Sequence, residues 1–125
     1  MASSLTVAQH RSNLQHLRSE TETTIANLQA AYDELDPEET PSDVGAGEDE
    51  GGSEGDLTRF ERDRIRARIA EETAYLEVID AALDRTQTRT WRKCASCGEA
   101  IGDARLEALP ATELCVTCKA RNGSW

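Results

Sequence analysis

Aromatic side chains make up only 4% of this chain of 125 residues, and hydrophobic residues of all kinds make up 38%. This composition fills one modest core at most, and a charged fraction of 30% keeps much of the chain in water. No apolar run approaches the roughly 20 residues that cross a bilayer. We therefore expect neither a large single globular domain nor a membrane protein.

Positive charge is also in short supply. The chain has 24 acidic and 14 basic residues, which gives a formal net charge of -10. A molecule with this balance repels the phosphate backbone, so we expect no direct, sequence-specific binding to DNA. A basic protein surface is the more natural partner.

Residues that support catalysis are few as well. His10 and His16 lie six positions apart in a stretch that we expect to be helical. This spacing brings them close to a common helical face but does not place both on it. No paired base, nucleophile or phosphate-binding glycine loop accompanies them, so we place both histidines at the solvated surface. The sequence does not predict an enzyme.

One specific pattern stands out, and it contains every cysteine of the chain. Two Cys-x-x-Cys pairs separated by seventeen residues supply four candidate metal ligands: Cys94, Cys97, Cys115 and Cys118. Four thiolates bind Zn²⁺ tetrahedrally and leave no open position for water, so the spacing predicts one structural zinc ion. Gly98, directly after the first pair, suits a tight turn with positive φ.

Other roles for the cysteines fit the sequence less well. Two disulfides would require an oxidising compartment, yet the first ten residues lack the basic, apolar and small-residue order of a signal peptide. A thioredoxin-type motif would follow a strand in a βαβ unit, which this sequence does not predict. We therefore expect reduced cysteines and a cytoplasmic protein.

Four thiolates around one divalent ion leave about two negative charges. Cations nearby in the sequence can offset them: Arg92, Lys93, Arg105, Lys119 and Arg121.

Two stretches carry apolar or small residues three or four positions apart. The first series is Val7, Leu14, Leu17, Thr21, Thr24, Leu28, Ala31 and Leu35, and the second is Ile65, Ile69, Leu76, Ile79 and Leu83. These are the seams of two long helices, and neither helix can bury its seam alone. We expect the two helices to pair antiparallel within one monomeric chain, although another protein or a second copy would satisfy the same pattern.

An acidic, glycine-rich segment separates the two helices. Residues 36–56 contain no basic residue, and this composition cannot bury enough surface to offset the entropy cost of ordering. The sequence therefore predicts a mostly α fold, an antiparallel helical hairpin (coiled coil) followed by a small C-terminal four-cysteine zinc finger. Its expected parts are a first helix in 1–35, a mobile acidic tip loop in 36–56, a second helix in 57–90 and the zinc finger in 91–125.

A longer set of residues resembles a known family. It consists of Ala82-Leu83-Asp84-Arg85, Thr90-Trp91, Cys94-Ala-Ser-Cys97-Gly98, Ile101, Arg105-Leu106, Ala108, Pro110 and Cys115-Val-Thr-Cys118. This combination is similar to the DksA/TraR family of bacterial transcription factors over roughly residues 57 to 119. The resemblance implies the same order of elements, a helical hairpin and then a C4-type zinc finger.

The resemblance also implies a function. It implies a protein that binds RNA polymerase directly, places its hairpin tip in the secondary channel and modulates initiation. The candidate partner-binding residues are Glu48, Asp49, Glu50, Glu54, Asp56, Arg59 and Arg62. The family's tip sequence Asp-x-x-Asp-x-Ala falls at Gly51, Glu54 and Asp56. Of the two aspartate positions, only the one at Glu54 keeps an acid, and Asp56 stands at the alanine position.

Two other functions remain open from the residues. One is a zinc-ribbon adaptor that binds another protein or a ribosomal partner through its arginine-rich helix and acidic loop. The other is a redox or metal sensor that responds through its thiolates.

Overall fold

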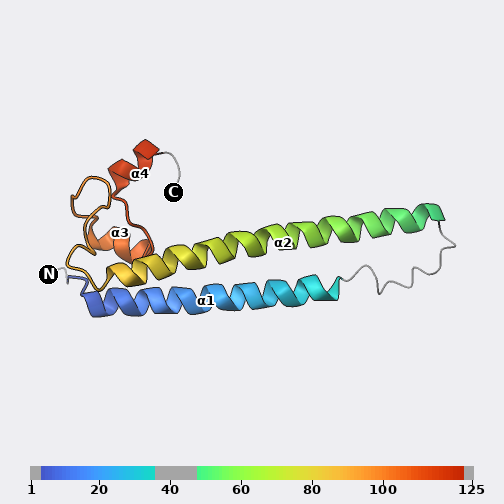
Figure 1. The fold of residues 1–125 in the computed structure, drawn as a ribbon, viewed down its shortest axis with the longest axis horizontal. Coiled ribbons are helices and arrows are strands. Elements are labelled where there is room, and N and C mark those ends of the chain that lie inside the picture. Colours follow the sequence, from blue (N-terminus) through green and yellow to red (C-terminus); the bar gives the residue numbers. More distant parts are fainter. Residues whose placement is uncertain (1–3, 36–47, 123–125) are drawn as a thin grey trace. The chain divides into compact units, whose positions relative to one another are not determined.

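The computed structural model describes residues 4–35 and 48–122, with side chains described in 4–35 and 57–121. Four helices form in these ranges: α1 Val7–Glu34, α2 Glu48–Arg85, α3 Asp103–Ala108 and α4 Val116–Asn122 (Figure 1). Extended backbone in the same ranges pairs only at an isolated antiparallel bridge between Lys93 and Ala100. The mostly α fold is thus confirmed. Within the described part of the chain, no helix combines the length and apolar character needed to cross a bilayer.

The chain divides into two compact units. One combines Met1–Thr21 with Tyr75–Trp125, and the other is Glu22–Ala74. The first unit therefore joins the beginning of α1 to the end of α2 and to the segment that carries all four cysteines. The second unit contains the rest of α1 and the first part of α2.

In the first unit, α1 and α2 run antiparallel and share a hydrophobic cluster (Figure 1). Leu14 of α1 and Ile79 of α2 are both fully buried in it. Ala82 and Ala111 complete the cluster, so the segment after α3 also packs against the two helices. Burial of these side chains stabilises the pairing of the two helices in this unit.

Polar contacts flank the cluster and join the same two helices. Arg18 of α1 pairs with Asp80 of α2, with 2.6 Å between Nε and Oδ1. The hydrogen bond from Arg18 holds the pKa of Asp80 below its ordinary value. Arg11 donates to the hydroxyl and the carbonyl oxygen of Thr86, at 3.1 Å and 3.2 Å. These contacts fix which residues of α1 face which residues of α2.

In the second unit, Tyr32 of α1 lies beside two arginines of α2. The guanidinium carbon of Arg62 lies 4.0 Å from the centroid of the Tyr32 ring, and that of Arg66 lies 5.4 Å from it. Arg66 also donates to the Tyr32 hydroxyl. A guanidinium is attracted to the negative face of an aromatic ring, so these contacts favour the pairing of the two helices in this unit. Packing in this unit thus includes arginine side chains where the sequence analysis had considered only apolar ones.

Every predicted member of the two helical seams is buried or half-buried: Val7, Leu14, Leu17, Thr21, Thr24, Leu28, Ala31, Leu35, Ile65, Ile69, Leu76, Ile79 and Leu83. Polar residues occupy the remaining seam positions. They are His10 in α1, Arg62 and Glu72 in α2, and Thr86 directly after α2. With these included, the alternation of three and four residues continues along both helices without a gap.

The surface position predicted for His10 is wrong. Its side chain is 3% exposed and stacks on Trp91, with ring centroids 5.0 Å apart and 23° between the ring planes. Its Nδ1 has no hydrogen-bond partner among the residues that the structure describes. Burial, and then the positive charges of Arg85 and Arg92, hold the pKa of His10 below its ordinary value.

This environment predicts that the protein loses stability on acidification. Because the pKa of His10 is lower in the folded than in the unfolded protein, the unfolded state binds the proton more strongly. The contribution is complete above the unfolded pKa of about 6.5 and is lost as the pH falls through the folded value. Urea unfolding at pH 7.5 and pH 5.5 measures this loss. Between these two pH values, the free energy of unfolding should fall less in His10→Phe than in the wild type.

The control for this experiment is His16, whose side chain is 76% exposed. The variant His16→Gln should keep the pH dependence of the wild type, because it leaves the buried His10 in place. An unchanged pH dependence in His10→Phe would contradict the assignment of this effect to His10.

The second helix differs from its prediction at both ends. It begins at Glu48, not at Leu57, and ends at Arg85, not at residue 90. Residues 48–56 are therefore helical where the sequence analysis expected loop. Acidic residues at 48–50 fall in the first helical turn, where the helix dipole favours negative charge, and this partly offsets the low helix propensity of glycine. Residues 36–47, and the mobility predicted for them, lie outside the described residues.

The early end of α2 follows from the threonines after it. The N–H of Thr86 is shared between the carbonyl oxygens of Ala82 and Leu83, and the N–H groups of residues 87 and 88 donate three residues back, which tightens the chain out of the α-helical pattern. The hydroxyls of Thr86 and Thr88 also donate to the carbonyl oxygens of Leu83 and Arg85. These side chains compete for the groups that would continue the helix.

Candidate metal centre

The first cysteine pair lies in a tight turn after α2. The N–H of Cys94 donates to the carbonyl oxygen of Glu99 at 2.7 Å, and the N–H of Gly98 donates to that of Cys94 at 3.0 Å. Gly98 has a φ of 79°, which confirms the positive φ predicted for this position. The turn thereby brings the side chains of Cys94 and Cys97 together.

The second pair is held by a helix. Cys115 directly precedes α4 and Cys118 lies in its first turn. The N–H of Lys119 donates to the carbonyl oxygen of Cys115 at 2.9 Å, so the helical hydrogen bonding begins at the cysteine itself. Residues three positions apart in a helical turn lie on one face, so Cys115 and Cys118 project to the same side.

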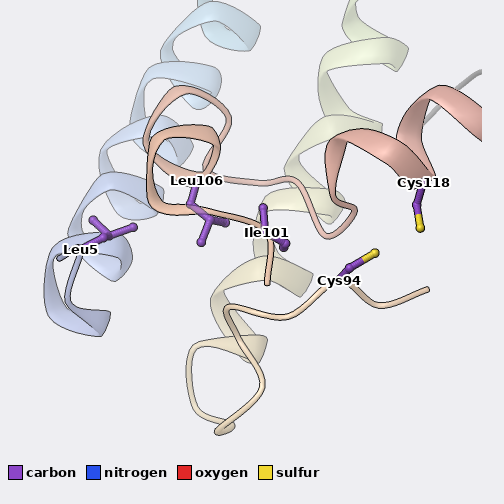
Figure 2. Packing of buried hydrophobic residues seen from close by; sticks show 5 residues of the cluster. All are labelled: Leu5, Cys94, Ile101, Leu106 and Cys118. Atoms are coloured by element: carbon purple, nitrogen blue, oxygen red, sulfur yellow. The ribbon is translucent and has the colours of Figure 1, made fainter. Parts of the chain in front are cut away.

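The four sulfur atoms gather into a cluster that fits a zinc ion. They lie within 4.8 Å of one another, and the Sγ atoms of Cys97 and Cys115 are 3.7 Å apart. Tetrahedral Zn²⁺ with bonds of about 2.3 Å separates its sulfur ligands by about 3.8 Å. Figure 2 shows the sulfur atoms of Cys94 and Cys118 pointing toward each other. The four cysteines are therefore positioned to hold one metal ion.

Backbone N–H groups point at three of the sulfur atoms, at 3.4 to 3.5 Å: Ser96 at Cys94, Glu99 at Cys97 and Cys118 at Cys115. Burial acts to raise the pKa of the Cys94 thiol, but hydrogen bonds from backbone N–H groups outweigh it and bring the pKa to about 6. The Glu99 N–H acts to lower the pKa of Cys97, whereas burial and the neighbouring thiols raise it to about 12. Zinc binds thiolates, so its binding must displace the protons held by the thiols of higher pKa.

A small hydrophobic cluster covers one side of the cysteines. Cys94 and Cys118 are 3% and 6% exposed, and they pack with Leu5, Ile101 and Leu106 (Figure 2). Cys97, in contrast, is exposed to solvent. The centre thus has a dry side formed by apolar residues and a side open to water.

Arginines near the cysteines hold the backbone that carries them. Arg85, at the end of α2, donates to the carbonyl oxygen of Lys93 at 2.7 Å, one residue before Cys94. Arg105 of α3 donates to the carbonyl oxygen of Leu114 at 2.9 Å, one residue before Cys115. Arg105, one of the cations expected to offset the thiolate charge, thus has a positioning role, and so does Arg85, which the sequence analysis did not name.

The sequence analysis missed two residues that complete this region. Leu5 is 2% exposed in the cysteine cluster, and its N–H donates to Oδ2 of Asp103 at 2.9 Å. This hydrogen bond, and then the Arg92 guanidinium, hold the pKa of Asp103 below its ordinary value. Leu5 and Asp103 are 98 positions apart, and such a separation leaves no local pattern in the sequence.

The candidate partner-binding residues belong to the second unit, whereas the cysteines belong to the first. Arg59 is exposed, and Arg62 is half-buried against Tyr32. The five acids fall within the first turns of α2, where side chains are outside the described residues: Glu48, Asp49, Glu50, Glu54 and Asp56.

Known proteins share both the sequence and the cysteine pattern of this region. A family model for the prokaryotic dksA/traR C4-type zinc finger matches residues 88–122, which include all four cysteines. A relative from Escherichia coli strain K12, the RNA polymerase-binding transcription factor DksA, is 34% identical over 103 residues, or 82% of this chain and 59% of the relative. The chain carries a zinc finger of the DksA/TraR family.

Other DksA proteins match over different extents. The DksA of Haemophilus influenzae is 42% identical over 48 residues, which are 38% of this chain and 33% of that protein. Among solved structures, transcription factor DksA2 from Pseudomonas aeruginosa matches with a TM-score of 0.74 at 25% identity, over 94% of this chain and 82% of that one. This chain spans about 59% of the length of the Escherichia coli and Salmonella typhimurium relatives.

Proposed function

We propose that this chain is a cytoplasmic, non-catalytic transcription regulator that binds RNA polymerase directly and modulates initiation. The observation that carries the proposal is the match to DksA2 over 94% of the chain, which includes the helices as well as the zinc finger. Curated relatives that match over 82% of the chain are named RNA polymerase-binding transcription factors. The net charge of -10 also favours contact with a protein over contact with DNA.

The metal has a structural role in this proposal. The four sulfur atoms of Cys94, Cys97, Cys115 and Cys118 would supply all the ligands of one zinc ion. Such a closed site has no position for a substrate, and bound zinc supplies only a cross-link. That cross-link joins the turn after α2 to the beginning of α4 and stabilises a segment with few apolar residues of its own.

We place the polymerase contact on the first part of α2. Leu57 and Phe60 are each 65% exposed, and the exposed Arg59 lies between them in the sequence. Exposed aromatic and arginine residues on one helix are typical of the central part of a protein interface. The acids at 48–56 precede this surface on the same helix, which supports a role for them in the secondary channel of the polymerase. Arg62 has a packing role against Tyr32.

The test is binding to purified core RNA polymerase together with transcription from a ribosomal promoter. We expect the wild type to bind at micromolar concentration or below and to change transcript yield. Phe60→Ala should weaken binding by about tenfold or more, because a truncated aromatic anchor costs about 2 kcal/mol. Val116→Ala is the matched control, since Val116 is 64% exposed on α4, and its binding should stay within about twofold.

A second variant separates binding from the effect on initiation. Replacing Glu54 and Asp56 with alanine should preserve binding to polymerase while reducing the change in transcript yield. If neither the wild type nor this variant associates with polymerase at micromolar concentrations in moderate salt, the proposal fails and an adaptor function takes its place.

A further inference from the structure

The segment before α1 is part of the zinc finger core. Leu5 belongs to the same hydrophobic cluster as Cys94 and Cys118, together with Ile101 and Leu106. Figure 2 shows the Leu5 side chain pointing toward Leu106 of α3. Leu5 thus covers the apolar side of the metal centre, although it lies far in the sequence from the first ligand, Cys94.

The main chain of Leu5 is held as firmly as its side chain. Its N–H donates to Oδ2 of Asp103 at 2.9 Å, and its carbonyl oxygen accepts from the Arg92 guanidinium. Arg92 also pairs with Oδ1 of Asp103, so the three residues form a closed ring of hydrogen bonds. Both backbone groups of a buried residue are thereby satisfied, which removes the cost of burying them unpaired.

Arg92 connects this ring to the first cysteine pair. It lies two positions before Cys94, and its carbonyl oxygen accepts from the N–H of Ile101 at 2.8 Å. Its guanidinium carbon lies 4.6 Å from the centroid of the Trp91 ring, and Trp91 in turn stacks on His10 of α1. The residue whose side chain holds Leu5 is therefore paired through its main chain with Ile101, on the other side of the first cysteine pair.

We infer that residues 4–6 form a strap on the zinc finger, with Arg92 and Asp103 as positioning residues, and that docking of the strap slows the release of zinc. The coupling runs in both directions. If the docked strap makes the metal bind more tightly, bound metal must hold the strap in place by the same factor. Neither Arg92 nor Asp103 is a ligand in this arrangement.

The first test measures zinc release from the zinc-loaded full chain, with excess of a chromogenic chelator at pH 7.5. Leu5→Ala and Arg92→Gly should each release zinc about tenfold faster or more, because truncating a buried leucine costs more than the free energy of a tenfold change. Arg89→Gly is the matched control, since it removes an exposed arginine three positions away, and its release rate should stay within about twofold.

Two further variants exclude a merely structural effect. The double variant Leu5→Ala with Arg92→Gly should release zinc at about the rate of the faster single variant, because both changes undo the same strap. Ile79→Ala destabilises the separate helical cluster, and we expect a smaller increase in release rate than for Leu5→Ala. Multiplying effects in the double variant, or an equal increase in Ile79→Ala, would overturn the inference.

The second test reads the strap itself and needs no measurement of zinc release. In the zinc-loaded protein, the Leu5 amide should be protected from hydrogen exchange. Chelation of the metal, or Arg92→Gly with zinc still bound, should reduce that protection by about tenfold or more. A Leu5 amide that exchanges at the same rate with and without zinc would show that the strap and the metal are independent.

Discussion

Replacing Cys118 with serine is expected to abolish tight zinc binding and to unfold the finger. Cys118 is 6% exposed, and its sulfur lies in the four-cysteine cluster. Zinc binding to four thiolates supplies a free energy on the order of 10 kcal/mol, and a hydroxyl cannot replace a thiolate ligand. Metal analysis after dialysis should give one zinc per chain for the wild type and close to none for Cys118→Ser. Amide signals of residues 91–121 should lose their dispersion in a heteronuclear NMR spectrum.

The control for this variant lies one position away. Thr117 is exposed between the two cysteines of the second pair, and Thr117→Ser should keep one zinc and a dispersed spectrum. Full retention of zinc by Cys118→Ser, with unchanged affinity, would exclude this sulfur as a ligand. Helical content should fall only in part, because most residues of α1 and α2 lie outside the finger.

Replacing Leu14 with alanine is expected to cost about 3 kcal/mol of the free energy of unfolding. Leu14 is fully buried against Ile79, Ala82 and Ala111, so its truncation removes apolar contacts and leaves a cavity. Small residues around the site, such as the two alanines, cannot extend to fill the space. Urea unfolding in saturating zinc, followed by circular dichroism at 222 nm, measures the loss.

Leu57→Ala serves as the comparison for Leu14→Ala. Leu57 is 65% exposed on α2, so the same chemical change should alter the free energy of unfolding by no more than about 0.5 kcal/mol. Equal costs at the two positions would mean that α1 and α2 do not bury Leu14 between them.

The cysteine cluster and the helical seams could be predicted because each has a pattern that repeats over short distances. Zinc imposes both the type and the spacing of its ligands, so two Cys-x-x-Cys pairs are informative before any fold is known. A long helix likewise repeats its buried positions every three or four residues. The resemblance to the DksA/TraR family rested on residues of the second helix and of the cysteine segment.

Other features escaped prediction for physical reasons. His10 and Glu72 occupy seam positions, but a search for apolar periodicity passes over polar residues even where they are buried or half-buried. The contacts of Leu5 with Arg92 and Asp103 join residues 87 and 98 positions apart, and no local propensity encodes them. The beginning of α2 at Glu48 was missed because glycine content was weighed above the favourable effect of acids in a first helical turn.

The polar residues between α1 and α2 also restrict the alternatives open to this chain. A leucine-only seam would tolerate a slide of seven residues, because every heptad looks like the next. In the first unit such a slide would separate Arg18 from Asp80 and Arg11 from Thr86, and would break the hydrogen bonds that join them. Stability is thus exchanged for a single register, which also disfavours symmetric association of two copies through the same seam.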